Sequence, residues 1–511
     1  MAAFAAIFLH NKGVNMKKYI MAFDAGTTSA RTILFNKDGE IVSQASKEFT
    51  QYFPHPGWVE EDASEIWSSQ IGTAVEAMSK ISATADEISA IGIANQRETT
   101  IVWDKNTGDA IYNAIVWQCK RTAPLCDKLK KDELTDMIKK KTGLVIDPYF
   151  SATKIKWILD NVPLAREKAQ KGELLFGTVD SYLIYKLTGG LCHITDYSNA
   201  SRTMLFNIKD LKWDDELLKI FDIPKSMLPQ VKNSSEIYGK SSSKFLGGEI
   251  PIAGILGDQQ ASLFGQACFN KAMAKATYGT GAFILMNTGN EIVNSNNGLV
   301  TTIAWSYKDK VTYALEGSIF ECGSAINWLR DDLKILDAAD DSEYMATKVK
   351  DTCGCFVVPA FSGLGAPYWN QYARGTIVGL TRAVSKYHIV RATLESLAYL
   401  SKDVLNAMEE DAGFKIEELK VDGGVSKNNF IMQFLSDMTG ISVLRPKIVE
   451  LTALGAAYMA GLGTGFWKDL EDAKNILKID ISFKSNFDEK KREEKIKAWH
   501  KAVKTSLYYK E

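Results

Sequence analysis

Residues 19–40 decide the fold of this chain, and they read Y-I-M-A-F-D-A-G-T-T-S-A-R-T-I-L-F-N-K-D-G-E. A short apolar run leads to Asp24, a polar turn follows, and a second apolar run begins at Thr32. This alternation predicts a strand, a turn and a strand. The pair Asp38-Gly39 predicts a second hairpin turn, because Gly accepts the positive φ that such turns require, so a third strand is expected from Ile41.

The first turn, Ala25-Gly26-Thr27-Thr28, combines a glycine and two hydroxyls with the carboxylate of Asp24. Backbone N–H groups and hydroxyls bind phosphate oxygens, and a carboxylate or its bound water holds Mg²⁺. The turn therefore indicates a phosphate site. An ordinary polar β-turn is the alternative that these residues alone leave open.

The length and charge of the chain limit its architecture and its partners. A chain of 511 residues is too long for one core, so two domains with a cleft between them are expected. The 61 Lys and Arg nearly cancel the 62 Asp and Glu, which argues against nucleic acid and an anionic membrane surface as partners. Because no run of about twenty apolar residues occurs, stable membrane insertion is not expected. A neutral or small substrate fits better.

The seven cysteines form no C-x-x-C pair, and the five scattered His complete no zinc spacing. An odd number of cysteines without a disulfide framework suits a reducing, cytoplasmic compartment. Cys353 and Cys355 flank one Gly before an apolar run, and we expect both to be buried thiols. Residues 1–15 carry a short apolar patch without a preceding positive charge, and we expect an extension outside the fold rather than a signal peptide.

Apolar periodicity predicts further elements along the chain. Strands are expected at residues 88–94, 99–103 and 114–117, and helices at 62–80, 121–142, 151–160, 178–188, 428–439, 452–462 and 489–507. This mixture places the chain in the α/β class. The segment 452–462 is rich in Ala and Gly and is expected to pack close to a neighbour, whereas 489–507 is expected to be a solvated surface helix.

The second half of the sequence echoes the first. Residues 250–256 predict a buried strand that leads to Asp258, and residues 275–286 place a second Gly-Thr turn between apolar runs. Such a duplication predicts two related domains, with the paired turns lining the cleft between them. We place the N-terminal domain, for polyol and phosphate binding, at 16–254 and the C-terminal domain, for the catalytic base and nucleotide, at 255–511.

Two common nucleotide motifs are missing from the sequence. The pattern G-x-x-x-x-G-K-[ST] does not occur, and no G-x-G-x-x-G follows a predicted strand. A phosphate site in this chain would therefore consist of hairpin turns that meet across the cleft.

Several longer segments, in this order, resemble the FGGY family of carbohydrate kinases. Two look like the family's signature segments, namely residues 149–161 and the pair 375–380 with 388–395. Four blocks are similar to the members that act on glycerol: residues 95–100, 114–118, 257–260 and 277–281. The resemblance runs from about Lys18 to Trp467, nearly the whole fold.

The resemblance implies an α/β fold of two actin-like (ribonuclease-H-like) ATPase domains that face each other across a central cleft. It implies transfer of the γ-phosphoryl group of ATP to a terminal hydroxyl of glycerol, giving sn-glycerol 3-phosphate. It also implies a homo-oligomer, either a dimer or a tetramer. Closure of the two domains would assemble the site and exclude water that would otherwise hydrolyse ATP.

A glycerol site needs a few fixed polar groups and an apolar wall. Arg97 and Glu98 offer donors and acceptors for a vicinal diol, although a structural ion pair between them is an equally good interpretation without the resemblance. Trp117, Tyr149 and Phe283 would form the wall.

Asp258 is the predicted catalytic base. The attacking hydroxyl must lose its proton as the P–O bond forms, and a carboxylate at a strand end can accept it. Gln259 would then hold a glycerol hydroxyl. The alternative for Asp258, taken alone, is a helix N-cap.

The resemblance also assigns the nucleotide contacts. The expected ATP-binding residues are Thr27, Thr28, Ser29 and Arg31 in the first domain and Gly279, Thr280, Gly281, Gly323, Asn327, Gly424 and Asn428 in the second, the last four toward adenosine. Asp24 would position Mg²⁺, through a water molecule.

Two rival functions stay open. A kinase for another polyol or ketose would keep the class and change the substrate, but it would need a roomier pocket than three bulky aromatics allow. A non-kinase, actin-like ATP switch would have no use for Arg97, Trp117 or Asp258.

Overall fold

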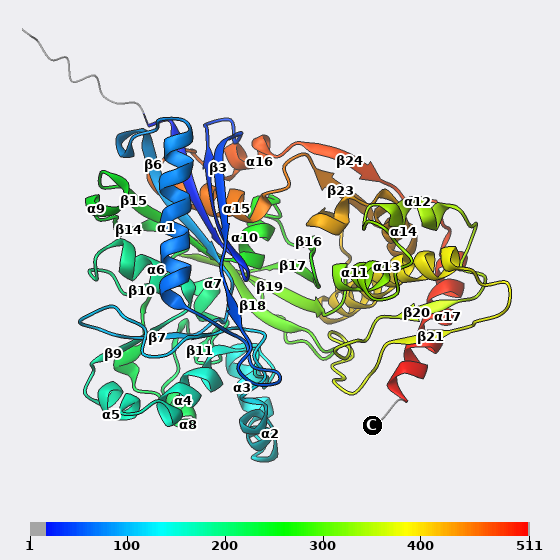
Figure 1. The fold of residues 1–511 in the computed structure, drawn as a ribbon, viewed down its shortest axis with the longest axis horizontal. Helices are drawn as coiled ribbons and strands as arrows, with labels where there is room; N and C mark the ends of the chain where they lie inside the picture. The colour runs from blue at the N-terminus through cyan, green and yellow to red at the C-terminus, as the bar shows by residue number, and fades with distance from the viewer. Residues whose placement is uncertain (1–16, 509–511) are drawn as a thin grey trace, which may run out of the picture.

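Two mixed β-sheets form the framework of the computed structural model, which describes residues 17–508 (Figure 1). The expected extension at 1–15 lies outside the described residues. The first sheet has the order β14-β15-β6-β1-β2-β3. Its strands are β1 (Tyr19–Ala25), β2 (Ser29–Phe35), β3 (Ile41–Glu48), β6 (Ile88–Asn95), β14 (Ser235–Lys240) and β15 (Pro251–Gly257).

The second sheet has the order β18-β19-β17-β16-β22-β23-β24 and lies to the right of the first in Figure 1. Its strands are β16 (Met273–Tyr278), β17 (Ala282–Gly289), β18 (Val300–Tyr307), β19 (Lys310–Ile319), β22 (Glu418–Asp422), β23 (Ser442–Pro446) and β24 (Ile479–Phe483).

The two sheets, of six and seven strands, share a common arrangement of five strands. In the first, β1 and β2 form an antiparallel hairpin, β6 and β15 follow parallel to β1, and β14 closes the edge antiparallel. In the second, β16 and β17 form the hairpin, β22 and β23 follow parallel to β16, and β24 closes the edge antiparallel. The α/β class and the internal duplication predicted from the sequence are therefore confirmed.

The strand predicted at 250–256 exists as β15, but it does not open the second repeat. It pairs in parallel with β6 and so completes the first sheet. The counterpart of β1 is β16, because each repeat begins with a hairpin and adds its parallel strands afterwards. The division of the chain into 16–254 and 255–511 stays a prediction.

The remaining elements surround the sheets. The helices are α1 (Ala63–Lys80), α2 (Ala123–Lys131), α3 (Thr135–Thr142), α4 (Ser151–Asn161), α5 (Ala165–Gln170), α6 (Val179–Leu187), α7 (Tyr197–Ala200), α8 (Asp215–Phe221), α9 (Ser243–Leu246), α10 (Asp258–Gly265), α11 (Gly323–Asp331), α12 (Asp341–Thr347), α13 (Lys386–Ala412), α14 (Asn429–Thr439), α15 (Leu451–Thr464), α16 (Leu470–Ile476) and α17 (Glu489–Leu507). Short strands are β4 (Gln51–Tyr52), β5 (Glu60–Glu61), β7 (Ile101–Asp104), β8 (Ala114–Ile115), β9 (Leu174–Gly177), β10 (Ile194–Asp196), β11 (Phe206–Asn207), β12 (Lys212–Trp213), β13 (Gln230–Lys232), β20 (Phe356–Val358) and β21 (Thr376–Val378), and 3₁₀ turns are η1 (Ala85–Glu87), η2 (Lys225–Met227) and η3 (Gly424–Lys427).

The single helix predicted at 121–142 is wrong in one respect, since the structure divides it into α2 and α3. Glu133, between them, has a φ of 58°, a left-handed conformation that an α-helix does not contain. The helix expected at 489–507 is α17, and it is less solvated than expected. Its Trp499 is fully buried, and the indole Nε1 donates to Asp403 Oδ2 of α13 at 2.7 Å.

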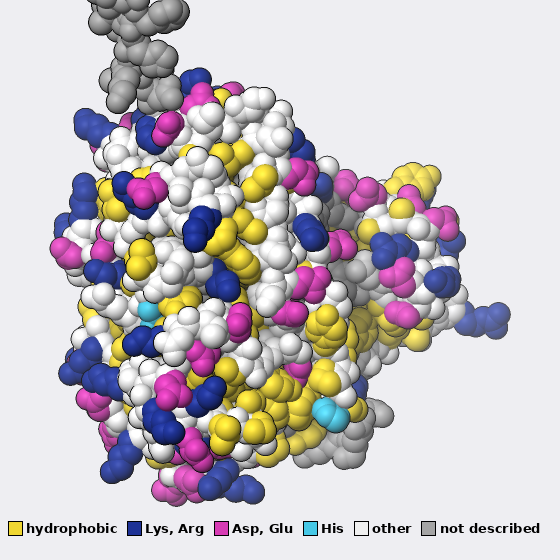
Figure 2. Space-filling model, turned by 60° about the vertical axis from the view of Figure 1, so that its left-hand side comes forward, with side chains coloured by type: hydrophobic (Ala, Val, Ile, Leu, Met, Phe, Trp, Pro, Cys, Tyr) yellow, Lys and Arg dark blue, Asp and Glu magenta, His cyan; other side chains and the backbone are white. Residues whose placement is uncertain are grey.

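The surface agrees with the near-neutral composition. On the face drawn in Figure 2, Lys and Arg side chains alternate with Asp and Glu, and neither sign dominates. Within residues 17–508, every helix is too short or too polar to cross a membrane. All seven cysteines are free; Cys355 is buried as predicted, but Cys353 is exposed, because it lies in a tight turn with a φ of 51°.

Helices α10 and α15 cross between the two sheets and bring their backbones into contact. A Cβ atom on Gly455 would lie 1.9 Å from Ala261 O, and one on Gly265 would lie 2.0 Å from Leu451 O. On its other side α15 covers the first sheet, where a Cβ on Gly92 would lie 2.1 Å from Ala456 O. The close packing predicted for 452–462 is confirmed, and the C-terminal half of the chain supplies a layer of the N-terminal sheet.

Replacing Gly455 with Ala should destabilise the protein by about 3 kcal/mol, since the added methyl group has backbone atoms in its place and forces the helices apart. Denaturant-induced unfolding measures the change. The matched control is Gly72→Ala on α1, where no atom lies within 4 Å and the better helix former should add about 0.5–1 kcal/mol. Equal stability of the two variants would show that α10 and α15 tolerate separation.

Candidate active site

The turn between β1 and β2 presents the residues predicted to bind phosphate. Gly26 N donates to Ser29 O at 3.0 Å and closes the turn, which leaves Thr28 exposed and Thr27 half-buried. Asp24 lies at the end of β1, in register with Arg31 on β2. The antiparallel hairpin thus holds a carboxylate, two threonines and a guanidinium where β1 ends and β2 begins.

Arg31 and Asp24 have further partners near the turn. Arg31 forms an ion pair with Glu450, at the start of α15. Burial raises the pKa of Asp24 to about 6; Arg31 lowers this pKa, whereas Glu450 and Asp258 raise it. Asp24 therefore faces both other carboxylates, although within residues 17–508 no group of three or more His, Cys, Asp or Glu side chains is arranged to hold a metal ion.

The turn between β16 and β17 lies against two other glycine-containing backbones. Gly279 O accepts from Gly323 N at 2.9 Å, at the start of α11, and Thr280 O accepts from Ser324 N at 3.2 Å. A Cβ atom on Gly323 would lie 2.7 Å from Gly279 O, and one on Gly423 would lie 2.4 Å from Tyr278 O. The structure thus brings together five of the predicted nucleotide residues: Gly279, Thr280, Gly281, Gly323 and Gly424.

The two predicted asparagines differ in their surroundings. Asn327 is exposed on α11, about one turn after Gly323. Asn428 is the N-cap of α14, where its Oδ1 accepts from Ile431 N at 3.0 Å and its Nδ2 donates to Ser342 Oγ at 3.3 Å. The Asn428 side chain therefore has a structural role that the sequence did not reveal.

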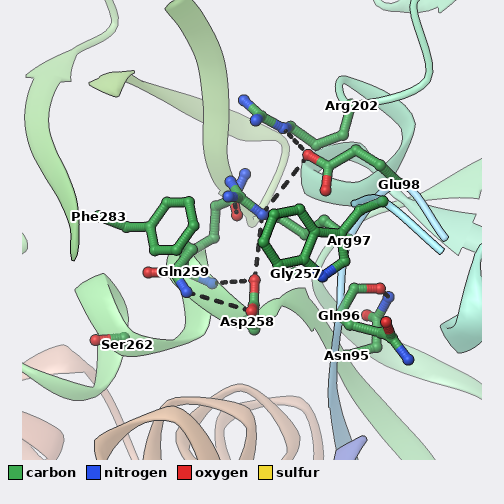
Figure 3. Close-up of polar contacts among 12 residues, drawn as sticks. Asn95, Gln96, Arg97, Glu98, Arg202, Gly257, Asp258, Gln259, Ser262 and Phe283 are labelled. Atoms are coloured by element: carbon green, nitrogen blue, oxygen red, sulfur yellow. Dashed lines mark hydrogen bonds and ion pairs between the residues drawn. The ribbon is translucent and has the colours of Figure 1, made fainter. Parts of the chain in front are cut away.

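Two arginines and two glutamates form a buried cluster, of which Figure 3 shows Arg97, Glu98 and Arg202. Arg97 Nη1 and Nη2 donate to Glu316 at 2.5 and 3.2 Å, and Arg202 donates to Glu98 at 2.6 Å and to Glu316 at 2.8 Å. Arg97 and Glu98 approach each other only to 3.8 Å. The simple Arg97–Glu98 ion pair considered from the sequence is thus replaced by a four-member network.

The charges of this network are balanced. Burial alone would raise the pKa of Glu316, but the guanidiniums of Arg202 and Arg97 lower it to about 2. Burial raises the pKa of Glu98 despite both arginines. Glu98 also adopts a left-handed φ of 61°, a strained conformation that persists where the surroundings hold it.

Asp258 contacts the Arg–Glu cluster on the side of the cluster that is accessible to solvent. Its Oδ1 lies 3.2 Å from Arg97 Nε and accepts from Gln259 N at 2.7 Å, and its Oδ2 accepts from Gln259 Nε2 at 3.2 Å. The Asp258 side chain is 28% exposed, whereas the Arg97 side chain is 2% exposed. The N-cap of α10 is Gly257, so the alternative role of Asp258 as an N-cap is wrong; as the first helical residue, its carboxylate faces free N–H groups that favour a negative charge.

The three predicted aromatics form one wall. The ring of Trp117 lies 5.6 Å from that of Tyr149 and 6.2 Å from that of Phe283. Tyr149 OH accepts from Arg97 Nη2 at 3.1 Å, and Trp117 Nε1 donates to Thr27 Oγ1 at 3.0 Å. The wall therefore connects the charged cluster to the turn between β1 and β2 that is predicted to bind phosphate.

Sequence reasoning missed Arg202, Gln260, Lys275 and Glu316. Gln260 Oε1 accepts from Arg97 Nη1 at 3.2 Å, and Lys275 Nζ donates to Gln259 Oε1 at 2.5 Å. A signal existed for Lys275 and Glu316, because each is a charged residue flanked by apolar residues or glycine within a strand. Gln260 lies in the block 257–260 that carries the family resemblance, whereas Arg202 carries no comparable signal.

Models of the FGGY family of carbohydrate kinases match the chain. The N-terminal domain of that family matches residues 19–265 and its C-terminal domain matches residues 274–464. Among curated relatives, the chain is similar to the glycerol kinase of Agathobacter rectalis, with 64% identity over 96% of this chain and 98% of the relative. The glycerol kinase of Alkaliphilus oremlandii is 59% identical over 97% of this chain and 99% of its own length.

Solved structures of carbohydrate kinases are also similar to this chain. The crystal structure of Plasmodium falciparum glycerol kinase with ADP has a TM-score of 0.91 and 38% identity to this chain, and the match covers 96% of this chain and 98% of the other. The gluconate kinase from Lactobacillus acidophilus has a TM-score of 0.87 at 23% identity, with 96% and 99% of the two chains covered, which shows a shared fold alone.

Proposed function

The chain belongs to the FGGY family of carbohydrate kinases, and from this premise we propose that it phosphorylates glycerol with ATP, giving ADP and sn-glycerol 3-phosphate. The family match, together with the duplicated sheets, confirms the predicted fold of two actin-like ATPase domains. One observation of geometry carries the proposal: the partly accessible carboxylate of Asp258 lies beside a buried guanidinium and a wall of three aromatic rings.

Glycerol is small and uncharged, so its site needs fixed polar groups on one side and apolar surface on the other. In this proposal Arg97 and Glu98 bind two neighbouring hydroxyls, and their rigid network with Glu316 and Arg202 keeps them in place before substrate arrives. Trp117, Tyr149 and Phe283 cover the carbon edge. The amide of Gln259 holds a third hydroxyl.

Asp258 is the proposed catalytic base. The attacking hydroxyl oxygen of glycerol bonds to the γ-phosphorus of ATP while the bond to the bridging oxygen of ADP breaks, and the hydroxyl proton passes to Asp258. Two N–H groups of Gln259 and the guanidinium of Arg97 stabilise the ionised carboxylate. An ionised base within reach of the hydroxyl contributes about 10²–10⁴-fold to the rate.

The two turns hold the ATP phosphates in this proposal. Thr27, Thr28 and Ser29 approach from the first sheet, with Arg31 beside them, and Gly279, Thr280 and Gly281 approach from the second. The contact between Trp117 and Thr27 supports it, because it connects the phosphate turn to the glycerol wall. Gly323 and Gly424 leave room for the nucleoside close to the backbone, with Asn327 and Asn428 at its rim.

The oxygen donors around Asp24 fit Mg²⁺. This ion usually binds one or two carboxylates and keeps water and substrate phosphates as its other ligands, so the lack of a larger acidic group in the described part of the chain is no obstacle. Burial, together with the nearby carboxylates of Glu450 and Asp258, raises the pKa of Asp24 although Arg31 lowers it, so a further cation would be favoured there. Bound Mg²⁺ would neutralise phosphate charge there, and Asp24 would hold it through a water molecule.

The cellular setting also belongs to this proposal. Seven free thiols suit a cytoplasmic enzyme. We expect a homo-oligomer, a dimer or a tetramer, as the family resemblance implies.

The purified protein should release ADP only when glycerol is present, and mass spectrometry should identify glycerol phosphate as the product. Glycerol is compared in the same assay with xylulose, ribulose and gluconate, at equal ATP. A higher kcat/KM for any of these three would assign the enzyme to that substrate. Slow ATP hydrolysis without a phosphorylated product would instead favour the ATP-switch alternative.

A further inference from the structure

Lys275 on β16 is a fully buried lysine directly beneath the proposed glycerol site. Its ammonium has three hydrogens and three neutral acceptors. It donates to Gln259 Oε1 at 2.5 Å, to Thr277 Oγ1 at 2.8 Å and to the backbone carbonyl of Phe283 at 3.4 Å. Because it is buried and its donors are used, Lys275 does not reach the substrate, but it contacts three elements that form the site.

The first contact fixes the direction of a hydrogen-bond chain. An ammonium can only donate, so Gln259 must direct its Oε1 toward Lys275. The Nε2 group of the same amide is then turned to Asp258, and it donates to Oδ2 at 3.2 Å. One N–H of the amide is left for a substrate hydroxyl. Without the ammonium, the Gln259 amide could rotate and place its oxygen against the Asp258 carboxylate.

The second contact starts a chain with the same direction. Ser262 uses its single hydroxyl hydrogen to donate to Asp422 Oδ2 at 2.8 Å. Thr277 Oγ1 lies 3.2 Å from Ser262 Oγ, so Thr277 must be the donor between them, while it accepts from Lys275. Asp422 ends β22, next to the glycines near the proposed nucleotide site. Both chains thus begin at Lys275 and end at carboxylates of the site.

The geometry points to protonated Lys275 as a positioning residue, which orients the Gln259 amide toward Asp258 and the Thr277–Ser262 hydroxyls toward Asp422. This inference rests on the proposed function for its kinetic consequences. The third contact, to the Phe283 carbonyl, holds the aromatic wall in the same arrangement.

Deprotonation of Lys275 should remove the fixed direction of both hydrogen-bond chains, because an amine can accept as well as donate. Burial lowers the pKa of Lys275 to about 8, while Asp422, Asp258 and Glu316 raise it and Arg97 lowers it. The ammonium is therefore present at pH 7 and is lost as the pH rises above about 8. The charged and titratable groups that surround Lys275 are Asp258 and Cys268 near α10, Glu316 on β19, Lys420 and Asp422 on β22, and Arg97.

The kinetic test replaces Lys275 with Met, which keeps the length of the side chain and removes its donors and charge. At pH 7 the kcat for glycerol should fall about 100-fold, because a misplaced amide disturbs the base and the substrate hydroxyl together. In the wild-type enzyme, kcat should decline above about pH 8 with the slope of one proton, and in Lys275→Met this decline should disappear. ADP is measured directly by chromatography, so that no coupling enzyme limits the pH range.

Lys420 offers a matched control. It lies opposite Lys275 in the parallel β16–β22 register, is buried, and donates to the carbonyls of Gln266 at 2.8 Å and Ala267 at 3.5 Å. Lys420→Met removes a buried ammonium from the same sheet, but the Lys420 ammonium donates to no member of the two hydrogen-bond chains. The kcat of this variant, per folded molecule, should therefore stay within about threefold of wild type. The inference is overturned if Lys275→Met keeps more than a third of the wild-type kcat, or keeps the decline at high pH.

A second measurement does not require turnover. With ¹⁵N-labelled glutamine, the side-chain amide signal of Gln259 is assigned by its loss in Gln259→Glu and is followed from pH 6.5 to 9.5. It should shift with a midpoint near pH 8 in the wild-type protein and stay constant in Lys275→Met. A wild-type signal that does not titrate refutes the inference even if glycerol is not the substrate, whereas absence of glycerol-dependent ADP from the wild-type enzyme refutes only the proposed function.

Discussion

Asp258→Asn should lower kcat by about 10³-fold or more while glycerol and ATP still bind. The amide has the shape of the carboxylate and keeps the acceptor that faces Arg97 Nε and Gln259 N. It loses only the bond from Gln259 Nε2, so most of the site stays assembled. It has almost no affinity for a proton, and the attacking hydroxyl therefore loses its base. Steady-state kinetics measure the loss, and calorimetry measures the two dissociation constants.

The control for this variant is Asp215→Asn. Asp215 is also the first residue of a helix, α8, but it is largely exposed and pairs with Lys225, outside the site. Its kcat should stay within about twofold of wild type, since exposed ion pairs contribute little. Near-normal turnover by Asp258→Asn would remove Asp258 from the role of base, and a large rise in the glycerol Kd would make it a binding residue.

Arg97→Met should have the second largest effect, on both stability and binding. The change leaves Glu98 and Glu316 buried with Arg202 as their one guanidinium partner in the network, and removing one member of a buried charge network costs about 3–5 kcal/mol. Glycerol loses a donor, and Tyr149 and Asp258 lose their contact with the guanidinium. We expect denaturation at lower urea concentration and a glycerol KM at least about 100-fold higher.

The double variant Arg97→Met/Glu316→Gln separates these two effects. With Glu316 neutral, Arg202 and Glu98 remain as one balanced pair, so most of the lost stability should return. The glycerol KM should stay high, because Arg97 is still absent. Recovery of both stability and KM would show that Arg97 is a structural partner of Glu316 and does not bind substrate. The single variant Glu316→Gln completes the cycle and isolates the coupling between the two residues.

The parts of the site that the sequence predicts are those that short segments create. The turn at 24–29, the Gly-Thr turn at 279–281 and the position of Asp258 after a strand all follow from neighbours in the chain. A hairpin needs only a glycine between two apolar runs, so β1, β2, β16 and β17 were expected within a few residues of their observed bounds. The family resemblance then assigned roles to these turns.

The parts that escaped prediction depend on residues far apart in the sequence. Arg97 and Glu316 are 219 positions apart, and Arg202 reaches both Glu98 and Glu316 from a third segment. No periodicity connects such positions, so their charges appear unpaired until the sheets pack. The assignment of β15 to the second repeat was wrong for a similar reason. The sequence of a buried parallel strand is equally compatible with either sheet, and only the pairing with β6 places β15 in the first.

The packing of α15 on the first sheet sets the order in which the protein can fold during its synthesis. Strands β1, β6 and β15 are all made by residue 257, yet the helix that covers them begins at residue 451. At translation rates of about 5–20 residues per second, the ribosome needs on the order of ten to forty seconds to supply it. The N-terminal sheet must therefore wait, with one apolar face open to chaperones or to other nascent chains, until nearly the whole polypeptide has been made.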